Sequence, residues 1–270
     1  MSSLSGRRVV VTGASGAFGR ALMAELARGG AKAVGLDLAP SDDPDARVLA
    51  CDITDAASVE AAAAEAIKLL GGLDVLVSNA GLGGPADAGA QPDEAAVRMI
   101  DVNLVGAWRV TAACIDALVA SRGRVVFVGS RMVHVPVPLG APYGASKRGL
   151  AAYADSLRLE YGTHIKVTSV NPSMVRTPIH DAAARAGLSL QGVSREEPLE
   201  GVVAKIIRAC EMDDPPREMA TTRRGAVEAF IGRHFPSLSD RMVRRVIAKQ
   251  VAAGTFDDAP MAAGLAERYR

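Results

Sequence analysis

RRVVVTGASGAFG, residues 7–19, is the stretch that decides the fold of this chain. Its apolar first half predicts a short strand over residues 7–12, and the pattern over residues 20–28 predicts a helix. Glycines between a strand and a helix let the backbone approach a pyrophosphate, whose charge the helix N-terminus favours. Gly13, Gly16 and Gly19 are spaced three apart, unlike the commonest dinucleotide fingerprint, and such a turn can also serve only to join two elements.

Apolar strand patterns and helical patterns alternate along the rest of the chain. Strands are expected at 32–38, 47–53, 73–78, 124–129 and 165–170, with a shorter one near residue 219. Helices are expected at 56–70, 92–120, from Pro142 at the first helical position to about residue 161, and at 199–210. This alternation predicts an α/β fold: a single Rossmann-type, doubly wound parallel sheet of about seven strands with helices on both faces.

Residues 1–222 are expected to form one catalytic domain. Within it, residues 174–198 have an irregular pattern typical of a substrate lid or a poorly ordered loop. Residues 223–270 are expected to be a helical extension packed on the same domain. Ser237 and Ser239 are predicted to cap a helix ending near Gln250, which buries an apolar stripe near the 174–198 segment, in its own or a neighbouring subunit. The stripe is composed of Leu238, Met242, Val243, Val246 and Ile247. The alternative is a membrane-surface helix, which the short stripe and the absence of bulky aromatics between Pro236 and Gln250 disfavour.

Composition excludes several classes of protein. The 270 residues contain 31 basic and 30 acidic side chains, so the net charge of +1 gives no overall attraction for nucleic acid, and membrane contact is not expected. The three cysteines are far apart and predict buried thiols, and the four histidines lack metal-ligand spacing, so no metal is expected. Without a signal-type segment or a run of ~18 apolar residues, a soluble cytoplasmic protein is expected.

The candidate chemistry lies in residues 130–147. Ser130 follows a predicted strand, and Tyr143 and Lys147 are four residues apart, hence on one face of a helix. Tyrosine with a pKa of about 10 is a poor base at neutral pH, and a nearby ammonium and a helix N-terminus would lower that pKa. Ser130 could then polarise the substrate oxygen that exchanges a proton with Tyr143. The alternative is a Tyr/Lys pair on an ordinary exposed helix.

Other polar residues follow the expected strands, where a parallel sheet binds its ligands. Asp37 is placed to contact an adenosine ribose and to repel a 2′-phosphate, which favours NAD over NADP. The alternative is that Asp37 only ends its strand. Asn79, Ala80 and Gly81 could approach a ligand or form only a turn. Asn103, within a predicted helix, either bonds to neighbouring backbone or links Lys147 to solvent through water.

These motifs together resemble those of the short-chain dehydrogenase/reductase family over residues 6–180. Thr12 to Gly19 is similar to its cofactor loop, 78–81 to its NNAG element, and 143–147 to its YxxxK element. The resemblance implies a catalytic tetrad of Asn103, Ser130, Tyr143 and Lys147, with Tyr143 as general acid/base and Lys147 lowering its pKa. It also implies an NAD site formed by Gly13, Ser15, Gly16, Ala17, Phe18, Gly19, Asp37, Asp52, Ile53, Asn79, Ala80, Gly81, Tyr143, Lys147, Pro172, Val175 and Thr177.

The expected function is therefore an NAD-dependent oxidoreductase acting on a secondary alcohol or ketone, in a homodimer or homotetramer. The alternative is a dinucleotide-binding regulatory or scaffold protein without turnover. A hydrophobic substrate is suggested by Met132, Val133, Val135, Val137, Leu139, Met174, Ile179 and Leu188, although ordinary core residues would have the same pattern. Arg131 could bind an acidic substrate group or pair with a neighbouring side chain.

Overall fold

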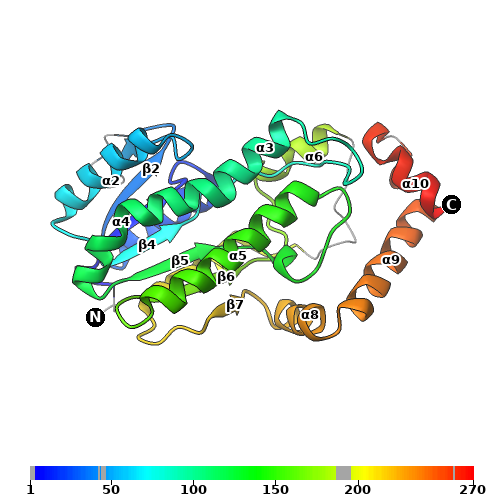
Figure 1. Cartoon of the computed structure of the whole chain (residues 1–270). Coiled ribbons are helices and arrows are strands. Elements are labelled where there is room, and N and C mark those ends of the chain that lie inside the picture. The colour runs from blue at the N-terminus through cyan, green and yellow to red at the C-terminus, as the bar shows by residue number, and fades with distance from the viewer. Residues whose placement is uncertain (1–3, 42, 44–46, 187–195, 258) are drawn as a thin grey trace.

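The computed structural model of the chain describes residues 4–41, 43, 47–186, 196–257 and 259–270. One parallel sheet with strand order β3-β2-β1-β4-β5-β6-β7 runs through it, and helices cover both faces (Figure 1), which confirms the expected fold class. The strands are β1 (Arg8–Thr12), β2 (Lys32–Asp37), β3 (Val48–Ala50), β4 (Val75–Ser78), β5 (Arg124–Val128), β6 (Lys166–Asn171) and β7 (Glu218–Ala220).

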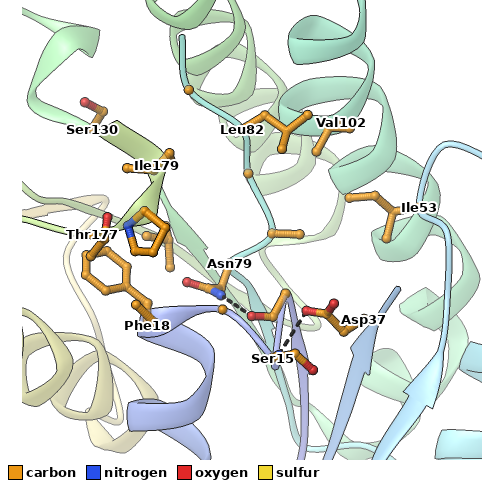
Figure 2. Close-up of a pocket in the computed structure, with 18 of the residues that line it drawn as sticks. Ser15, Phe18, Asp37, Ile53, Asn79, Leu82, Val102, Ser130, Thr177 and Ile179 are labelled. Atoms are coloured by element: carbon orange, nitrogen blue, oxygen red, sulfur yellow. Dashed lines mark hydrogen bonds between the residues drawn. The ribbon is translucent and has the colours of Figure 1, made fainter. Parts of the chain in front are cut away.

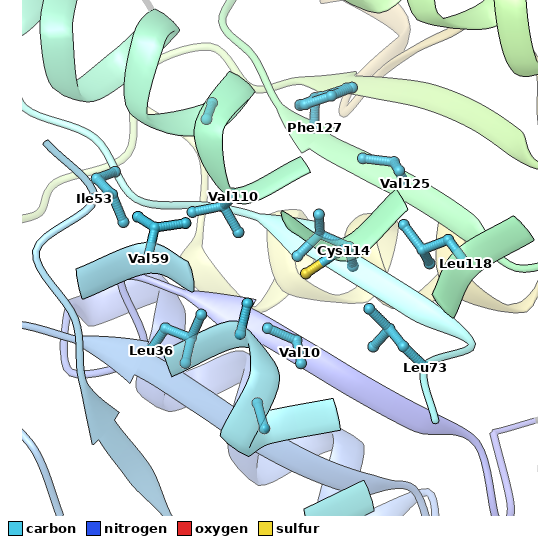
Figure 3. Packing of buried hydrophobic residues seen from close by; sticks show 14 of the residues in the cluster. Val10, Leu36, Ile53, Val59, Leu73, Val110, Cys114, Leu118, Val125 and Phe127 are labelled. Atoms are coloured by element: carbon cyan, nitrogen blue, oxygen red, sulfur yellow. The ribbon is translucent and has the colours of Figure 1, made fainter. Parts of the chain in front are cut away.

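The two faces of the sheet are covered by different helices. Helices α2 (Ala56–Leu70), α4 (Ala107–Ser121) and α5 (Ala141–Tyr161) pack against Val10, Val125 and Phe127 (Figure 3). Helices α1 (Ala17–Arg28) and α7 (Leu199–Glu211) pack on the other face, against Val9 and Val11. Because successive strand residues point to opposite faces, a continuous run of β-branched residues supplies both cores, and the strands read as unbroken apolar segments.

The order in which strands are added to the sheet reverses beside β1. The chain first adds β2 and β3 on one side of β1 and then places β4 on the other side, followed by β5, β6 and β7. The carboxyl ends of β1 and β4 therefore border a crevice, the position where open parallel sheets bind ligands. The glycine turn follows β1 and Asn79 follows β4, so the topology brings both to this crevice.

Several boundaries differ from those expected. Helix α1 begins at Ala17 rather than Arg20, because Gly19 has no side chain to keep the helix away from the turn: a Cβ there would lie 2.1 Å from the Gly13 carbonyl oxygen. Strand β3 ends at Ala50, since the Asp52 N–H donates to Ser58 Oγ instead of continuing the ladder.

The long helix expected at 92–120 is interrupted by a π-helical turn. Helix α3 (Glu94–Ile100) continues through η1 (Asp101–Gly106) into α4. By length and mean hydropathy (1.4) the stretch Glu94–Ser121 could cross a membrane. Its buried side chains, among them Val110 and Leu118, belong to the core that α2, α4 and α5 form with the sheet.

The sequence predicts an irregular segment over 174–198, but part of it is helical. Its described part contains the turn η3 (Pro178–His180) and helix α6 (Asp181–Arg185), while residues 187–195, and with them Leu188, lie outside the described residues. A hydrogen bond from the Glu197 N–H to the Met174 carbonyl, 2.7 Å, joins the two ends of this segment.

Helices form residues 223–270: α8 (Arg223–His234), α9 (Pro236–Ala252) and α10 (Ala263–Tyr269), with the turn η4 (Pro260–Ala262) between the last two. The expected caps are wrong, because α9 begins at Pro236 and has Phe235 at its N-cap. The predicted stripe is also wrong in part, since Leu238 and Met242 are 44% and 46% exposed. The apolar cluster of α9, η4 and α10 packs against Ala183 and Ala186, which confirms contact with the 174–198 segment.

Candidate functional site

The turn between β1 and α1 has a backbone shape that suits an anion. Gly13 has a φ of +67°, and a Cβ at this position would lie 2.8 Å from Ala80 Cα, so only glycine fits. Gly16 is the N-cap of α1, and because glycine has no side chain it cannot cap the first N–H groups of the helix. The first backbone N–H groups of α1, at Ala17 and Phe18, border a cavity, and together with the helix dipole they suit a phosphate group.

Asp37 lies at the end of β2, beside this turn. Its Oδ2 accepts a hydrogen bond from the Ser15 N–H at 2.9 Å (Figure 2), and its Oδ1 accepts one from the Ala39 N–H at 3.1 Å. Two backbone donors therefore fix the carboxylate at the rim of the cavity. A carboxylate held in this way is suited to accept hydrogen bonds from a ribose diol and to repel a phosphate.

Asp52 and Ile53 follow β3 on the same side of the cavity. Asp52 Oδ1 accepts hydrogen bonds from the hydroxyl and the N–H of Thr54, at 2.7 and 2.9 Å, and these bonds lower the pKa of Asp52. Ile53 is buried against Gly106, where a Cβ would lie 2.7 Å from Ile53 Cγ1. The close approach of η1 to this loop therefore holds an apolar wall at the cavity.

Asn79 joins the end of β4 to the glycine turn. Its Nδ2 donates to the carbonyl oxygens of Thr12 and Gly13, at 2.9 and 3.2 Å, and the N–H groups of Asn79 and Ala80 both bond to Thr12 Oγ1 at 3.0 Å. Thr12 is 1% exposed, so these bonds are made in the interior. Asn79 thus fixes the distance between the two strands that border the crevice.

Ser130, Tyr143 and Lys147 come together where β5 and α5 meet. Ser130 follows β5, and its Oγ accepts a hydrogen bond from the Met132 N–H at 3.2 Å as it caps the turn η2 (Arg131–Val133). Tyr143 lies in the first turn of α5, in which Pro142 is the second residue rather than the first. Lys147 is 4% exposed, and its Nζ donates to the Val128 carbonyl at 2.9 Å and lies 5.8 Å from the centre of the Tyr143 ring.

Burial of Tyr143 opposes the lowering of its pKa that is expected of Lys147, and that role of Lys147 stays a prediction. Desolvation by burial raises the pKa of Tyr143, and a hydrogen bond with Ser130 acts in the opposite direction without reversing it. Burial also lowers the pKa of Lys147 to about 8. In this state the phenol is protonated at neutral pH and is placed to donate a proton, so a base at Tyr143 needs additional positive charge.

Asn103 is fully buried within η1, and all its bonds described here go to protein groups. Its Oδ1 accepts from the Leu82 N–H at 2.7 Å, and its Nδ2 donates to the Leu82 carbonyl at 2.9 Å and to Ser146 Oγ at 3.0 Å. The bonds to the Leu82 backbone correspond to the first of the two alternatives, and a link from Lys147 to solvent through water stays a prediction. It fixes the loop after Gly81 against α5, close to Lys147.

A single cavity of about 660 Å³ connects most of these residues. Seventeen of the nineteen positions expected in the two sets line it, from the glycine turn to the expected catalytic residues: Gly13, Ser15, Gly16, Ala17, Phe18, Asp37, Asp52, Ile53, Asn79, Ala80, Gly81, Ser130, Tyr143, Lys147, Pro172, Val175 and Thr177. Gly19 and Asn103 do not line it, because both are buried in packing contacts behind its wall.

The cavity has further walls that sequence reasoning missed. Leu82, Gly83 and Pro178 line it, as do the cations Arg20, Arg98 and Arg185. A run of glycines and prolines after a strand was the available signal for the first group, but the arginines carry none. Of the apolar residues expected to form the substrate wall, Ile179 is the described one that lines this cavity, whereas Leu139 packs against the cluster of α9 and α10.

Arg131 does not line this cavity, although it directly follows Ser130. Its side chain is 8% exposed and forms an ion pair with Glu228 of α8, with Nη1 and Oε2 2.8 Å apart. The second of the two alternatives, pairing with a neighbour, therefore describes Arg131. Among the described residues no group of three or more His, Cys, Asp or Glu side chains could hold a metal ion, and Cys51, Cys114 and Cys210 are buried free thiols.

Comparison with known proteins gives a consistent result. The sequence model described as short chain dehydrogenase matches residues 7–187. The chain is 30% identical to oxidoreductase UcpA of Escherichia coli K12 over 78% of this chain and 83% of that protein. It is 34% identical to an uncharacterized NAD-dependent oxidoreductase of Mycobacterium tuberculosis over 67% of this chain and 76% of that protein.

Solved structures share the fold. A short chain dehydrogenase from Burkholderia cenocepacia in complex with NADP superimposes with a TM-score of 0.76 at 24% identity, covering 88% of this chain and 98% of that one. The aldohexose dehydrogenase of Thermoplasma acidophilum superimposes with a TM-score of 0.69 at 22% identity, covering 82% and 94%. At these identities the likeness concerns the fold alone.

Proposed function

This chain belongs to the short-chain dehydrogenase/reductase family, and we propose that it is an NAD-dependent oxidoreductase that interconverts a secondary alcohol and a ketone. The observation that supports the proposal most is the continuity of one cavity, which joins a phosphate cradle at Gly16 to the hydroxyls of Ser130 and Tyr143. A dinucleotide bound along it would have its reactive end beside two hydroxyls, one able to exchange a proton with the substrate and one able to polarise the substrate oxygen.

The residues present fit a nicotinamide dinucleotide. The donors of the glycine turn and of α1 would hold the pyrophosphate, Asp37 would hold the adenosine ribose, and Asp52 with Ile53 would border the adenine. Asn79, Lys147 and Thr177 also line the cavity. When bound, the cofactor supplies a hydride acceptor in the oxidising direction and a hydride donor in the reducing direction.

In the proposed mechanism Tyr143 moves the proton. When the alcohol is oxidised, its carbon loses a hydride and its hydroxyl loses a proton to the Tyr143 phenolate. When the ketone is reduced, the Tyr143 phenol donates that proton to the oxygen as the carbon gains the hydride. Ser130 would donate a hydrogen bond to the same oxygen, and Lys147 would hold the cofactor ribose and add positive charge near the phenolate.

The proposed preference for NAD rests on Asp37, whose charge stands where a 2′-phosphate would lie. The Arg20 side chain also lines the cavity and donates to the Ser15 carbonyl, so one cation is nearby and the preference is expected to be finite. A hydrophobic substrate is proposed from Leu82, Val102 and Ile179, which face the same cavity (Figure 2).

The test is NADH formation, followed by absorbance, with a panel of aliphatic, alicyclic and aromatic secondary alcohols. Tyr143→Phe should lower kcat by about 100-fold or more while NAD affinity changes little, because general acid/base groups contribute at least that much. Tyr161→Phe, at the far end of the same helix, is the matched control and should retain activity. Tight NAD binding without turnover on any alcohol or ketone would instead support a regulatory or scaffold protein.

A further inference from the structure

Helices α8 and α9 carry an exposed apolar strip on the outside of the molecule. Its members are large side chains between 44% and 58% exposed: Val227, Phe230, Phe235, Leu238 and Met242. They are continuous, since the rings of Phe230 and Phe235 have centroids 6.3 Å apart and the Leu238 N–H bonds to the Phe235 carbonyl at 2.9 Å. In Figure 1, α8 and α9 lie along the edge of the molecule, with α8 beside the edge strand β7 and α9 farther from the sheet.

The inner face of α9 already packs against other parts of the chain, so the exposed strip is a second apolar face of the helix. Ser239, Ile247, Gln250 and Val251 are the buried residues of α9, and Ile247 and Val251 join the cluster with α10. Leu238 and Met242, four residues apart, occupy the opposite side of the helix. Contiguous exposed apolar side chains of this size mark an interaction surface.

Positive charge is concentrated on the same two helices. Residues 223–250 contain seven Arg or Lys and two Asp or Glu, whereas the whole chain has 31 and 30. Arg224 and Arg233 are paired with Glu228 and Glu218. Five cations have no acidic partner among the described residues: Arg223, Arg241, Arg244, Arg245 and Lys249.

The cations and the strip share one face of α9. At 100° per residue, Arg241, Arg245 and Lys249 project on the same side of the helix as Leu238 and Met242. Two copies joined through this face about a twofold axis would bring one cationic surface against another, which disfavours a self-complementary contact. An apolar strip bordered by cations suits a partner with an anionic surface above a hydrocarbon interior.

We propose that the outer face of α8 and α9 binds an anionic lipid membrane surface, with the apolar strip entering the headgroup boundary and the cations contacting lipid phosphates. For this helix, the expectation of no membrane contact used the absence of bulky aromatics between Pro236 and Gln250. The structure places Phe230 and Phe235 beside that helix, so two aromatic rings become available from the preceding residues. The active-site cavity would remain open, because none of these side chains lines it.

The test is flotation of the full chain with vesicles of phosphatidylcholine alone or mixed with phosphatidylglycerol. The protein should float with the mixed vesicles only, and raised salt should weaken the binding. The triple variant Arg241→Gln, Arg245→Gln, Lys249→Gln should bind roughly 100-fold more weakly, given the contribution of each cation near an anionic surface. Leu238→Gln with Met242→Gln should also lose flotation, and enzyme activity in solution should stay unchanged.

Matched variants elsewhere separate this surface from general charge and hydrophobicity. Lys32→Gln, Lys68→Gln and Arg208→Gln remove three exposed cations, and Leu69→Gln with Leu159→Gln removes two exposed apolar side chains, so both variants should float like the native chain. No flotation of the native chain, or equal flotation of the Arg241 triple variant, would overturn the proposal. It would also be overturned if Leu238→Gln with Met242→Gln reduced the oligomer mass while native protein ignored vesicles, or if the native chain bound DNA but not vesicles.

Discussion

Arg131 and Glu228 join the active-site loop to the C-terminal helices through an ion pair of 2.8 Å. Arg131 follows Ser130 directly, and its backbone N–H is bonded to the Pro172 carbonyl at 2.8 Å. Glu228 belongs to α8 and accepts a second bond from Arg224. Burial would raise the pKa of Glu228, but the bonds from the two arginines outweigh it, and the pKa lies below its usual range. Residues 97 positions apart are thus coupled beside the site.

Glu228→Gln should reduce stability more than a surface change does, because the Arg131 side chain is 8% exposed and would lose a buried charge partner. We expect a loss of about 2 kcal/mol in the free energy of unfolding, measured by urea denaturation. Arg224→Gln removes a 69% exposed partner of the same carboxylate and should cost less than about 1 kcal/mol. Equal losses in the two variants would show that the Arg131 pair contributes nothing special.

Oxidation and reduction should depend on pH in opposite directions. Oxidation needs the Tyr143 phenolate, so kcat/KM for the alcohol should rise with pH through the Tyr143 titration, and reduction should fall. The Ser130 bond lowers the pKa of Tyr143. Ser130→Ala should therefore move both the rise of oxidation and the fall of reduction to higher pH. It should also reduce kcat by about 100-fold. An unshifted profile would mean that Ser130 does not act on Tyr143. Ser156→Ala, on the exposed side of α5, is the control.

Asp37→Asn should narrow the preference for NAD over NADP, since it removes the charge and retains the size of the side chain. Asp37→Ala should narrow it further, because the backbone N–H groups of Ser15 and Ala39 lose their acceptor and the turn is less ordered. We expect a change of about tenfold or more in the ratio of kcat/KM values, as one removed repulsion is worth at least that. Equal kcat/KM for NAD and NADP in the native enzyme would contradict this role.

Acid should destabilise the contact between β7 and the loop after η2. The His134 ring bonds to Glu218 at 2.7 Å, and this bond lowers the pKa of Glu218 below its ordinary 4.5. A carboxylate whose pKa is lower in the folded state contributes stability above its unfolded pKa and loses it as the pH falls. The urea concentration at the unfolding midpoint should therefore decrease as the pH is lowered below about 5, and Glu218→Gln should make that decrease smaller. An unchanged slope in Glu218→Gln would contradict the assignment.

The sequence predicts the sheet well because its strands are buried on both faces and read as unbroken apolar runs, such as Val9 to Val11. The glycine turn is equally predictable, since Gly13 must adopt a positive φ next to Ala80. Side-chain partners far along the chain are not predictable by pattern. Asn103 bonds to Leu82, and Arg131 pairs with Glu228, and no local signal indicates either partner. The direction of the Tyr143 pKa shift also depends on burial, which a motif does not contain.

The C-terminal helices can be removed without removing a strand of the sheet if the chain ends at Thr222. A cut after Asp214 would also remove β7, which pairs with β6, and would confuse loss of the sheet edge with loss of the helices. A chain ending at Thr222 loses Glu228 beside Ser130 and the cluster that packs on α6. Because α6 borders the cavity through Arg185 and the glycine turn is distant from both contacts, KM for the substrate should rise while NAD affinity changes little. Glu228→Gln in the full chain separates the two causes, as it removes the ion pair and retains the cluster. Wild-type KM and stability in the shortened chain would show that these helices play no part in the substrate site.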